Sequence, residues 1–268
     1  MNSRGIAVIT GASAGIGAVY ARRLAHRGYD LVLVARNEER LKALAADITV
    51  DTGHSVEVLI ADLATPEGVA RVSDRLRNDE RVTLLVNNAG FAKLGPLAAI
   101  SDTDSEAMID LNITALTLLT QAALPGLVAR GNGGIINIAS MLSVVALPAA
   151  AIYGGTKAYV LHFTRSLADE LEDSGVRVQA VMPGVIRTEL WDGSNVSLDS
   201  FPTEITMTAE QLVDAALAGW DSGEVFTLPS LEDVRYWNDF EAARETLAPM
   251  LSKNRAGSRY LQPAGRTN

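Results

Sequence analysis

Residues 6–17 read IAVITGASAGIG, an apolar run that leads directly into a glycine-rich segment. The β-branched residues at positions 6–10 predict a strand, and residues 15–27 predict a helix. The glycines allow a tight turn, and the start of the helix offers free N–H groups and the positive end of its dipole to a phosphate. The segment therefore predicts a pyrophosphate site, although an ordinary strand-to-helix turn would show the same local pattern.

The same alternation of short apolar runs and longer helical stretches continues along the chain. Strands are expected at residues 31–35, 56–60, 82–86, 135–139, 176–181 and 225–228, and helices at residues 38–51, 66–78, 104–129, 151–173 and 209–220. Such a pattern indicates a parallel sheet covered on both faces, since parallel strands need crossover connections. We predict one α/β domain over residues 1–268, a doubly wound parallel sheet (Rossmann fold) in a three-layer αβα sandwich. Its ligands bind beyond the carboxyl ends of the strands.

Composition excludes several classes of function. The 268 residues carry a formal net charge of −9, which disfavours a nucleic-acid partner because phosphate binding needs a concentrated basic surface. The chain has no cysteine, and its three histidines are far apart in the sequence, so a metal site is not expected. No signal peptide or membrane-spanning run is apparent. We expect a cytoplasmic protein that binds no metal ion and no membrane.

A group of polar residues is predicted at the carboxyl ends of the strands. Ser140 directly follows an expected strand, and Tyr153 and Lys157 project from one face at the start of the next helix. Two hydroxyls can polarise a carbonyl and exchange a proton with it, while a nearby ammonium lowers the pKa of a phenol and can bond a ribose hydroxyl. Each residue alone would suggest packing, a turn or a solvated surface. Together they predict Tyr153 as acid/base, Lys157 as its activating cation and Ser140 as the carbonyl-polarising group.

With its other motifs, the chain resembles the short-chain dehydrogenase/reductase family. The resemblance covers about residues 6–188 and rests on the GxxxGxG spacing of the turn, the NNAG tetrapeptide, the Ser-Tyr-Lys set and the PGVIRT segment. It implies an oxidoreductase that transfers hydride between a nicotinamide cofactor and a carbonyl or secondary alcohol. It also implies Asn112 as a fourth catalytic residue, which holds a water in a proton relay from Lys157.

The end of the second expected strand favours NADP over NAD. In dinucleotide-binding folds an acidic residue there holds the ribose 2′-OH of NAD, whereas an arginine accommodates the 2′-phosphate of NADP. Arg36 stands at this position, and the nearest carboxylates fall at the other end of the strand or in the next helix. A guanidinium binds phosphate through two parallel hydrogen bonds. We therefore predict NADP(H), with a solvated arginine at the helix start as the alternative.

The resemblance supplies the remaining cofactor contacts. Asp62 would bond the adenine amino group with the help of the Leu63 backbone, although an Asp here could instead cap the next helix. Thr188 would bond the nicotinamide carboxamide, and Asn87 would mainly tie neighbouring strands together. The expected cofactor-binding residues are Gly11, Ser13, Ile16, Gly17, Arg36, Asp62, Leu63, Asn88, Ala89, Gly90, Tyr153, Lys157, Pro183, Val185 and Thr188.

The segments that would select the substrate are less regular. Residues 189–207 have a turn-rich composition that suits a mobile lid. Apolar residues near Ser140 and after NNAG predict a pocket for a hydrophobic ketone, aldehyde or secondary alcohol. Residues 229–268 form a helical extension, similar to NADP-dependent reductases of unspecified substrate. Its aromatic residues either pack against the domain, which is the favoured alternative, or line the substrate site. The resemblance implies a homodimer or homotetramer.

Two other functions share these motifs. The first is a cofactor-binding regulatory or scaffold protein that has lost turnover, and the complete set of Asn112, Ser140, Tyr153 and Lys157 disfavours it. The second is a relative with non-redox chemistry, such as a dehalogenase or dehydratase. Retention of both Lys157 and the phosphate-binding turn disfavours that alternative.

Overall fold

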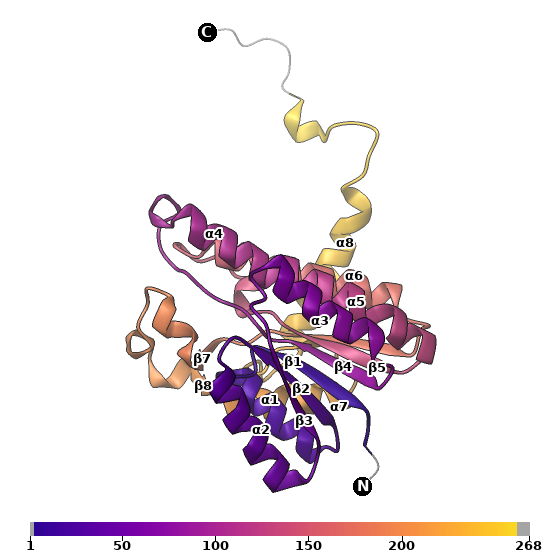
Figure 1. The fold of residues 1–268 in the computed structure, drawn as a ribbon. Helices are drawn as coiled ribbons and strands as arrows, with labels where there is room; N and C mark the ends of the chain where they lie inside the picture. The colour runs from indigo at the N-terminus through magenta and orange to yellow at the C-terminus, as the bar shows by residue number, and fades with distance from the viewer. Residues whose placement is uncertain (1–2, 262–268) are drawn as a thin grey trace. The chain divides into compact units, whose positions relative to one another are not determined.

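The computed structural model describes residues 3–261, and its core is a seven-stranded sheet (Figure 1). All neighbouring strands are parallel. In spatial order they are β3 (Val56–Ile60), β2 (Asp30–Ala35), β1 (Ile6–Thr10), β4 (Val82–Asn87), β5 (Gly133–Ile138), β6 (Val176–Val181) and β9 (Phe226–Thr227). The order reverses between β1 and β4, which is where sheets of this kind bind their ligands. The predicted doubly wound α/β fold is therefore confirmed.

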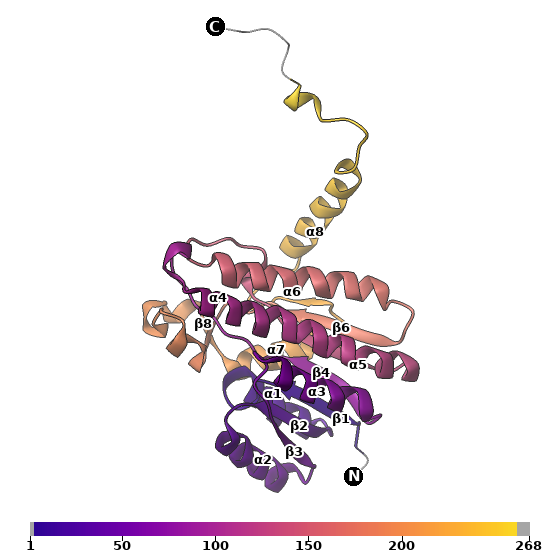
Figure 2. The same ribbon diagram turned by 45° about the horizontal axis from the view of Figure 1, so that its top comes forward.

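Helices cover both faces of the sheet (Figures 1 and 2). On one face lie α1 (Gly15–His26), α2 (Glu38–Thr52) and α7 (Ala209–Asp221), and on the other lie α3 (Pro66–Asn78), α5 (Leu116–Arg130) and α6 (Ala151–Glu170). Successive residues of a strand point to opposite faces, so β1 sends Ile9 into one buried layer and Val8 into the other. Both layers are dominated by aliphatic side chains, and they fix the edge of the sheet from which the functional loops emerge.

The helix expected at residues 104–129 differs most from its prediction. It begins earlier, as α4 (Asp102–Ile109), because the Ser101 hydroxyl accepts a hydrogen bond from the amide of Asp104 and caps the first turn. A π-helical turn, η2 (Asp110–Ala115), then separates α4 from α5. A local sequence pattern read at a period of 3.6 residues does not reveal such a widened turn, which often marks a functional site.

By length and composition alone, the helical stretch Asp102–Arg130 is long and apolar enough to cross a membrane. This finding corrects the expectation that the chain contains no such stretch. In the fold this stretch is a core helix. Leu119, Ala123 and Leu127 are buried in the layer between α5 and the sheet. This packing accounts for part of its apolar composition, whereas Ile109, Leu118 and Val128 of the same stretch are exposed.

The chain divides into two compact units, Met1–Pro229 and Ser230–Asn268. The first unit also contains two short paired strands, β7 (Val185–Arg187) and β8 (Thr206–Thr208). In the second unit, α8 (Arg235–Leu247) brings the rings of Trp237 and Phe240 into a stacked contact, with centroids 5.3 Å apart, while Tyr236 is largely exposed.

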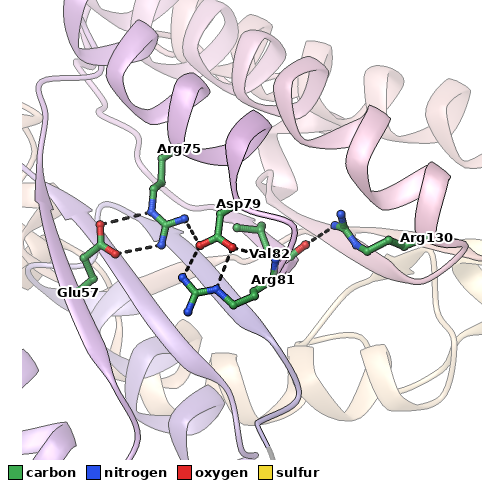
Figure 3. Close-up of polar contacts among 6 residues, drawn as sticks. All are labelled: Glu57, Arg75, Asp79, Arg81, Val82 and Arg130. Atoms are coloured by element: carbon green, nitrogen blue, oxygen red, sulfur yellow. Dashed lines mark hydrogen bonds and ion pairs between the residues drawn. The ribbon is translucent and has the colours of Figure 1, made fainter.

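An ion-pair cluster joins β3, α3 and the start of β4 at the edge of the sheet where the strands begin (Figure 3). Arg75 pairs with Glu57, with nitrogen and oxygen 3.0 Å apart, and also with Asp79. The Asp79 carboxylate accepts hydrogen bonds from the Arg81 side chain at 2.7 Å and from its amide at 2.9 Å. These bonds from Arg81, reinforced by Arg75, hold the pKa of Asp79 well below its usual range.

Replacing Asp79 by Asn should lower the free energy of unfolding at pH 7 by about 2 kcal/mol, because two arginines lose a shared, mostly buried carboxylate. A carboxylate with a depressed pKa contributes its full stability above its unfolded pKa, about 3.9, and loses it as the pH falls further. The difference between wild type and variant should therefore shrink below pH 4. Urea titrations at several pH values measure it.

The matched control is Asp74→Asn, which removes an exposed ion pair with Arg77 on the same helix and should cost less than about 0.5 kcal/mol. Equal destabilisation by the two substitutions would contradict the assigned role of the Asp79 cluster.

Candidate active site

The glycine-rich turn after β1 has the geometry of a phosphate cradle. Gly11 adopts a left-handed φ of +65°, and a Cβ on Gly17 would lie only 2.3 Å from the Gly11 carbonyl oxygen. Only glycine allows this approach of α1 to the turn. The residue before α1 is Ala14, which provides no side-chain cap for the first N–H groups of the helix. Ser13 and Ile16, on either side of the helix start, are half-buried. These features fit a pyrophosphate bound at the helix start.

The NNAG segment after β4 is bonded to this turn. The Thr10 hydroxyl accepts hydrogen bonds from the amides of Asn88 at 3.0 Å and Ala89 at 2.9 Å. In return, the Asn88 side-chain amide donates to the carbonyls of Thr10 at 2.8 Å and Gly11 at 3.2 Å. The two loops at the reversal of strand order therefore form one unit.

Asn87, the first residue of NNAG, does tie neighbouring elements together. Its side-chain amide donates to Asn137 of β5 at 2.9 Å and to Thr120 of α5 at 3.0 Å. Asn137 in turn donates to Thr164 of α6 at 2.9 Å. All four side chains are buried, and these bonds satisfy the Asn87 side-chain nitrogen, whereas its side-chain oxygen has no hydrogen-bond partner among the residues that the structure describes.

Arg36 and Asp62 come together at the ends of β2 and β3. Arg36 is largely exposed, and its guanidinium lies 3.6 Å from the Asp62 carboxylate. Asp62 accepts a bond from the Ala64 amide at 3.0 Å, whereas the cap of α3 is Thr65, which accepts from Gly68. The alternative role of Asp62 as the helix cap is therefore wrong. Its carboxylate is partly exposed beside Arg36, while the Leu63 side chain is buried in the core.

The predicted catalytic residues Ser140, Tyr153 and Lys157 meet at the end of β5. The Ser140 side chain lies close enough to the Tyr153 hydroxyl to favour its phenolate form and lower its pKa. The Lys157 ammonium lies 5.8 Å from the centre of the Tyr153 ring and donates to the Ile138 carbonyl at 2.8 Å. The helical spacing of four residues thus places phenol and ammonium side by side.

Asn112 lies within the π-helical turn η2 and is almost fully buried. Its side-chain oxygen accepts from the Phe91 amide, and its nitrogen donates to the Phe91 carbonyl, both at 3.0 Å. The same nitrogen donates to the Thr156 hydroxyl at 3.1 Å. Asn112 therefore clamps the loop after NNAG to α6. A Cβ on Gly90 would lie 3.3 Å from the Asn112 side-chain oxygen and 3.5 Å from the Lys157 nitrogen, so both groups face the space that this glycine leaves.

Burial disfavours the charged forms of Tyr153 and Lys157 and shifts the pKa of each side chain accordingly. It raises the pKa of the half-buried Tyr153 to about 12, partly offset by the hydrogen bond with Ser140. It lowers the pKa of Lys157 to about 8, so this side chain is still mostly cationic at neutral pH. The prediction of a lowered Tyr153 pKa is therefore wrong for the protein by itself. Desolvation of the phenolate raises this pKa more than the effects that favour the phenolate lower it.

The loop after β6 reaches back to both halves of the site. The Pro183 carbonyl accepts a hydrogen bond from the Met141 amide at 2.8 Å, next to Ser140, and Val185 opens the short strand β7. Thr188 sits against the glycine-rich turn, where a Cβ on Gly15 would lie 3.1 Å from its methyl group.

Exposed apolar side chains follow Ser140 in the chain. Met141, Val144 and Leu147, in the loop after Ser140, are more than one third exposed. In the lid segment, residues 189–207, the rings of Trp191 and Phe201 are in contact, with centroids 4.8 Å apart.

Several residues of the site carry no sequence signal of their own. Thr10, Phe91 and Thr156 hold the predicted residues in place through hydrogen bonds to partners 21 to 79 positions away. The only hint was their position next to a motif. Within residues 3–261, no group of three or more His, Cys, Asp or Glu side chains is arranged to hold a metal ion.

Comparisons with known proteins find relatives with the same fold. A model of the short chain dehydrogenase family matches residues 5–198. A short-chain dehydrogenase from Sphingobium yanoikuyae, solved in complex with NADPH, is 43% identical, with a TM-score of 0.92 over 96% of this chain and 100% of that chain. The bulky-bulky ketone specific alcohol dehydrogenase from Comamonas testosteroni is 37% identical, with a TM-score of 0.89 over 96% and 99%.

Two curated relatives show how far function varies at this level of similarity. Oxidoreductase UcpA of Escherichia coli K12 is 39% identical over 69% of this chain and 70% of its own length. The human inactive hydroxysteroid dehydrogenase-like protein 1 is 34% identical over 70% of this chain and 58% of its own length.

The depressed pKa of Lys157 predicts a pH dependence of stability. Between about pH 8 and 10.5 the unfolded chain binds a proton at Lys157 that the folded chain does not, so the free energy of unfolding should rise with pH. From pH 8 to 10 the rise from this residue should be about 2 kcal/mol. This rise should be missing in Lys157→Met. The difference in the free energy of unfolding between the two proteins therefore separates the contribution of Lys157 from that of other titrating groups.

Guanidinium chloride titrations at pH 7.5, 8.5, 9.5 and 10 measure this difference. Parallel curves of stability against pH for wild type and Lys157→Met would show that the Lys157 pKa is not depressed. Lys42→Met, on the exposed face of α2, is the control and should follow the wild type.

Proposed function

Because the chain belongs to the short-chain dehydrogenase family of oxidoreductases, we propose that it transfers hydride between NADP(H) and a carbonyl or secondary alcohol carbon. The observation that carries this proposal is the meeting of Ser140, Tyr153 and Lys157 at the same sheet edge as the phosphate cradle. The carboxyl ends of the parallel strands lie at one edge of the sheet. The residues that would bind the cofactor and those that would transfer the proton can therefore meet at this edge.

In this mechanism the nicotinamide supplies or accepts the hydride, and the chain handles the proton. The hydroxyls of Ser140 and Tyr153 would hold the substrate oxygen between them. As hydride reaches the carbonyl carbon, the charge that develops on this oxygen is stabilised by Ser140 and removed by a proton from Tyr153. The high pKa of Tyr153 keeps the phenol protonated at neutral pH, which suits a proton donor in the direction of reduction.

Lys157 and Asn112 would restore the proton to Tyr153. The Lys157 cation favours the phenolate that forms during reduction, and the ammonium would also bond the nicotinamide ribose. The Asn112 side-chain oxygen and the Lys157 nitrogen both face the space over Gly90. A water held there by Asn112 would connect Lys157 with solvent.

Arg36 supports NADP(H) as the cofactor. Its exposed guanidinium lies at the end of β2, where the 2′-phosphate of a dinucleotide would be placed. Asp62, 3.6 Å away, would contact the adenine. The similar Sphingobium enzyme was solved with NADPH, which is consistent with this assignment.

The substrate we propose is a hydrophobic ketone or aldehyde, or the corresponding alcohol. The exposed apolar residues Met141, Val144 and Leu147 follow the catalytic Ser140 and would face such a substrate. The similar Comamonas enzyme is specific for bulky-bulky ketones. We further propose that the protein acts in the cytoplasm as a homodimer or homotetramer.

The second candidate function is cofactor binding without turnover. The similarity to a human relative that is named as inactive supports this second candidate function. Tight NADPH binding combined with no oxidation of NADPH by any of a panel of aromatic, aliphatic and charged carbonyls would support it. Turnover of small charged carbonyls alone would instead contradict the proposal of a hydrophobic substrate.

Tyr153→Phe should lower kcat/KM for ketone reduction by at least about 100-fold, because the proton donor is removed. The Kd of NADPH should change by less than about threefold. Spectrophotometric assays and fluorescence titration measure the two quantities. Tyr159→Phe on the exposed side of the same helix is the control and should keep wild-type activity. A Tyr153→Phe protein with more than a tenth of wild-type activity would contradict the assigned acid/base.

Arg36→Asp should weaken NADPH binding by about 30- to 100-fold, since two charge-assisted hydrogen bonds to the 2′-phosphate are lost and a repulsive charge is added. NADH binding should change by less than about threefold. Lys42→Asp on α2 makes the same change of charge away from the expected phosphate and serves as the control. An unchanged ratio of the two affinities would rule out Arg36 as the selector of NADP.

A further inference from the structure

Three loops on the substrate side of the site are joined by backbone hydrogen bonds. They are residues 91–96 after NNAG, residues 141–150 after Ser140, and the lid segment. The Gly95 amide donates to the Ala149 carbonyl at 2.8 Å, which joins the first loop to the second. The Leu94 amide donates to the Ser194 carbonyl at 2.8 Å, which joins the first loop to the lid segment. The first loop is thus the common support of the other two.

Backbone strain is concentrated at these junctions. Within residues 3–261, the non-glycine residues with a left-handed φ are Ala149, at +65°, and Asn195, at +69°. Ala149 provides the acceptor for Gly95, and Asn195 directly follows the acceptor for Leu94. An L-residue held in this conformation is costly and persists where surrounding contacts enforce it, typically at ligand-binding sites. The hydrogen bonds between the loops are such contacts.

Asn195 adds a second bond to the junction between lid and loop. Its side-chain amide donates to the Leu94 carbonyl at 3.2 Å, so the amide and the carbonyl of Leu94 are both bonded to the tip of the lid segment. Asparagine tolerates the left-handed conformation better than most residues and provides a donor that glycine lacks. The residue type therefore matches both requirements of this position.

The neighbouring turn is built to present Asn195 in this way. Ser194 is fully buried, and its hydroxyl bonds the carbonyls of Trp191 and Val196, both at 3.0 Å. The Trp191 indole donates to the Ile186 carbonyl at 2.7 Å, which links the turn to β7. At the other end of the path, Phe91 begins the supporting loop and is clamped by Asn112.

We propose that Asn195 is a positioning residue that holds the lid segment on the loop after NNAG and so sets how tightly a ketone is retained beside Tyr153. The inference rests on the proposed function, since it assigns the substrate side of that same site. Loss of the Asn195 amide frees the tip of the lid segment while the catalytic group and the phosphate cradle stay in place. The substrate then dissociates more readily, and the cofactor does not.

The test compares Asn195→Asp and Asn195→Gly with the wild type. Both variants tolerate the left-handed conformation, and at neutral pH neither can donate to the Leu94 carbonyl. Each should raise KM for a bulky ketone by about fivefold, with kcat and the Kd of NADPH within about twofold of wild type. Hydrogen exchange of the Leu94 amide should be faster in both. Asn132→Asp, an exposed asparagine before β5, is the control for the added charge.

The outcomes separate the inference from the function on which it rests. An active wild type with unchanged KM in both variants would overturn the role of Asn195 and leave the proposed function standing. Unchanged hydrogen exchange at Leu94 would likewise refute the bond between lid and loop, even in a wild type without turnover. A wild type that reduces no carbonyl would instead overturn the proposed function. A parallel rise in the Kd of NADPH would assign Asn195 a general structural role and contradict the inference.

Discussion

The hydrogen bonds between Thr10 and the NNAG segment are the contacts on which the rest of the site depends. They join β1 to β4, the two strands between which the order of the sheet reverses. Because these strands are parallel and buried on both faces, their carboxyl ends cannot shift relative to each other without breaking the core. The glycine-rich turn and Gly90 are positioned from this junction.

The catalytic group shows how burial and charge are balanced. Burial of Lys157 lowers its pKa to about 8, yet the side chain remains mostly charged at neutral pH. Its ammonium donates one hydrogen bond to the Ile138 carbonyl. Tyr153 is shifted in the opposite direction, to about 12. A neutral phenol next to a cation is the state that favours giving a proton to a substrate oxygen, which supports the proposed role of Tyr153 in reduction.

The cofactor side and the substrate side are held by different means. On the cofactor side, close backbone contacts such as that of Gly17 with Gly11 leave no room for other side chains. On the substrate side, three loops are joined by a few hydrogen bonds, one of them from the exposed side chain of Asn195.

The sequence by itself determined the fold, the glycine-rich turn and the meeting of Ser140, Tyr153 and Lys157, because these depend on local periodicity and on the rule that parallel strands end at one edge. Only the tertiary structure decided the π-helical turn at Asn112, the exclusion of Asp62 as a helix cap, the raised pKa of Tyr153 and the bond from Asn195 to Leu94. Each of these depends on burial or on a partner that is distant in the chain. Packing chooses such partners, and local patterns do not encode them.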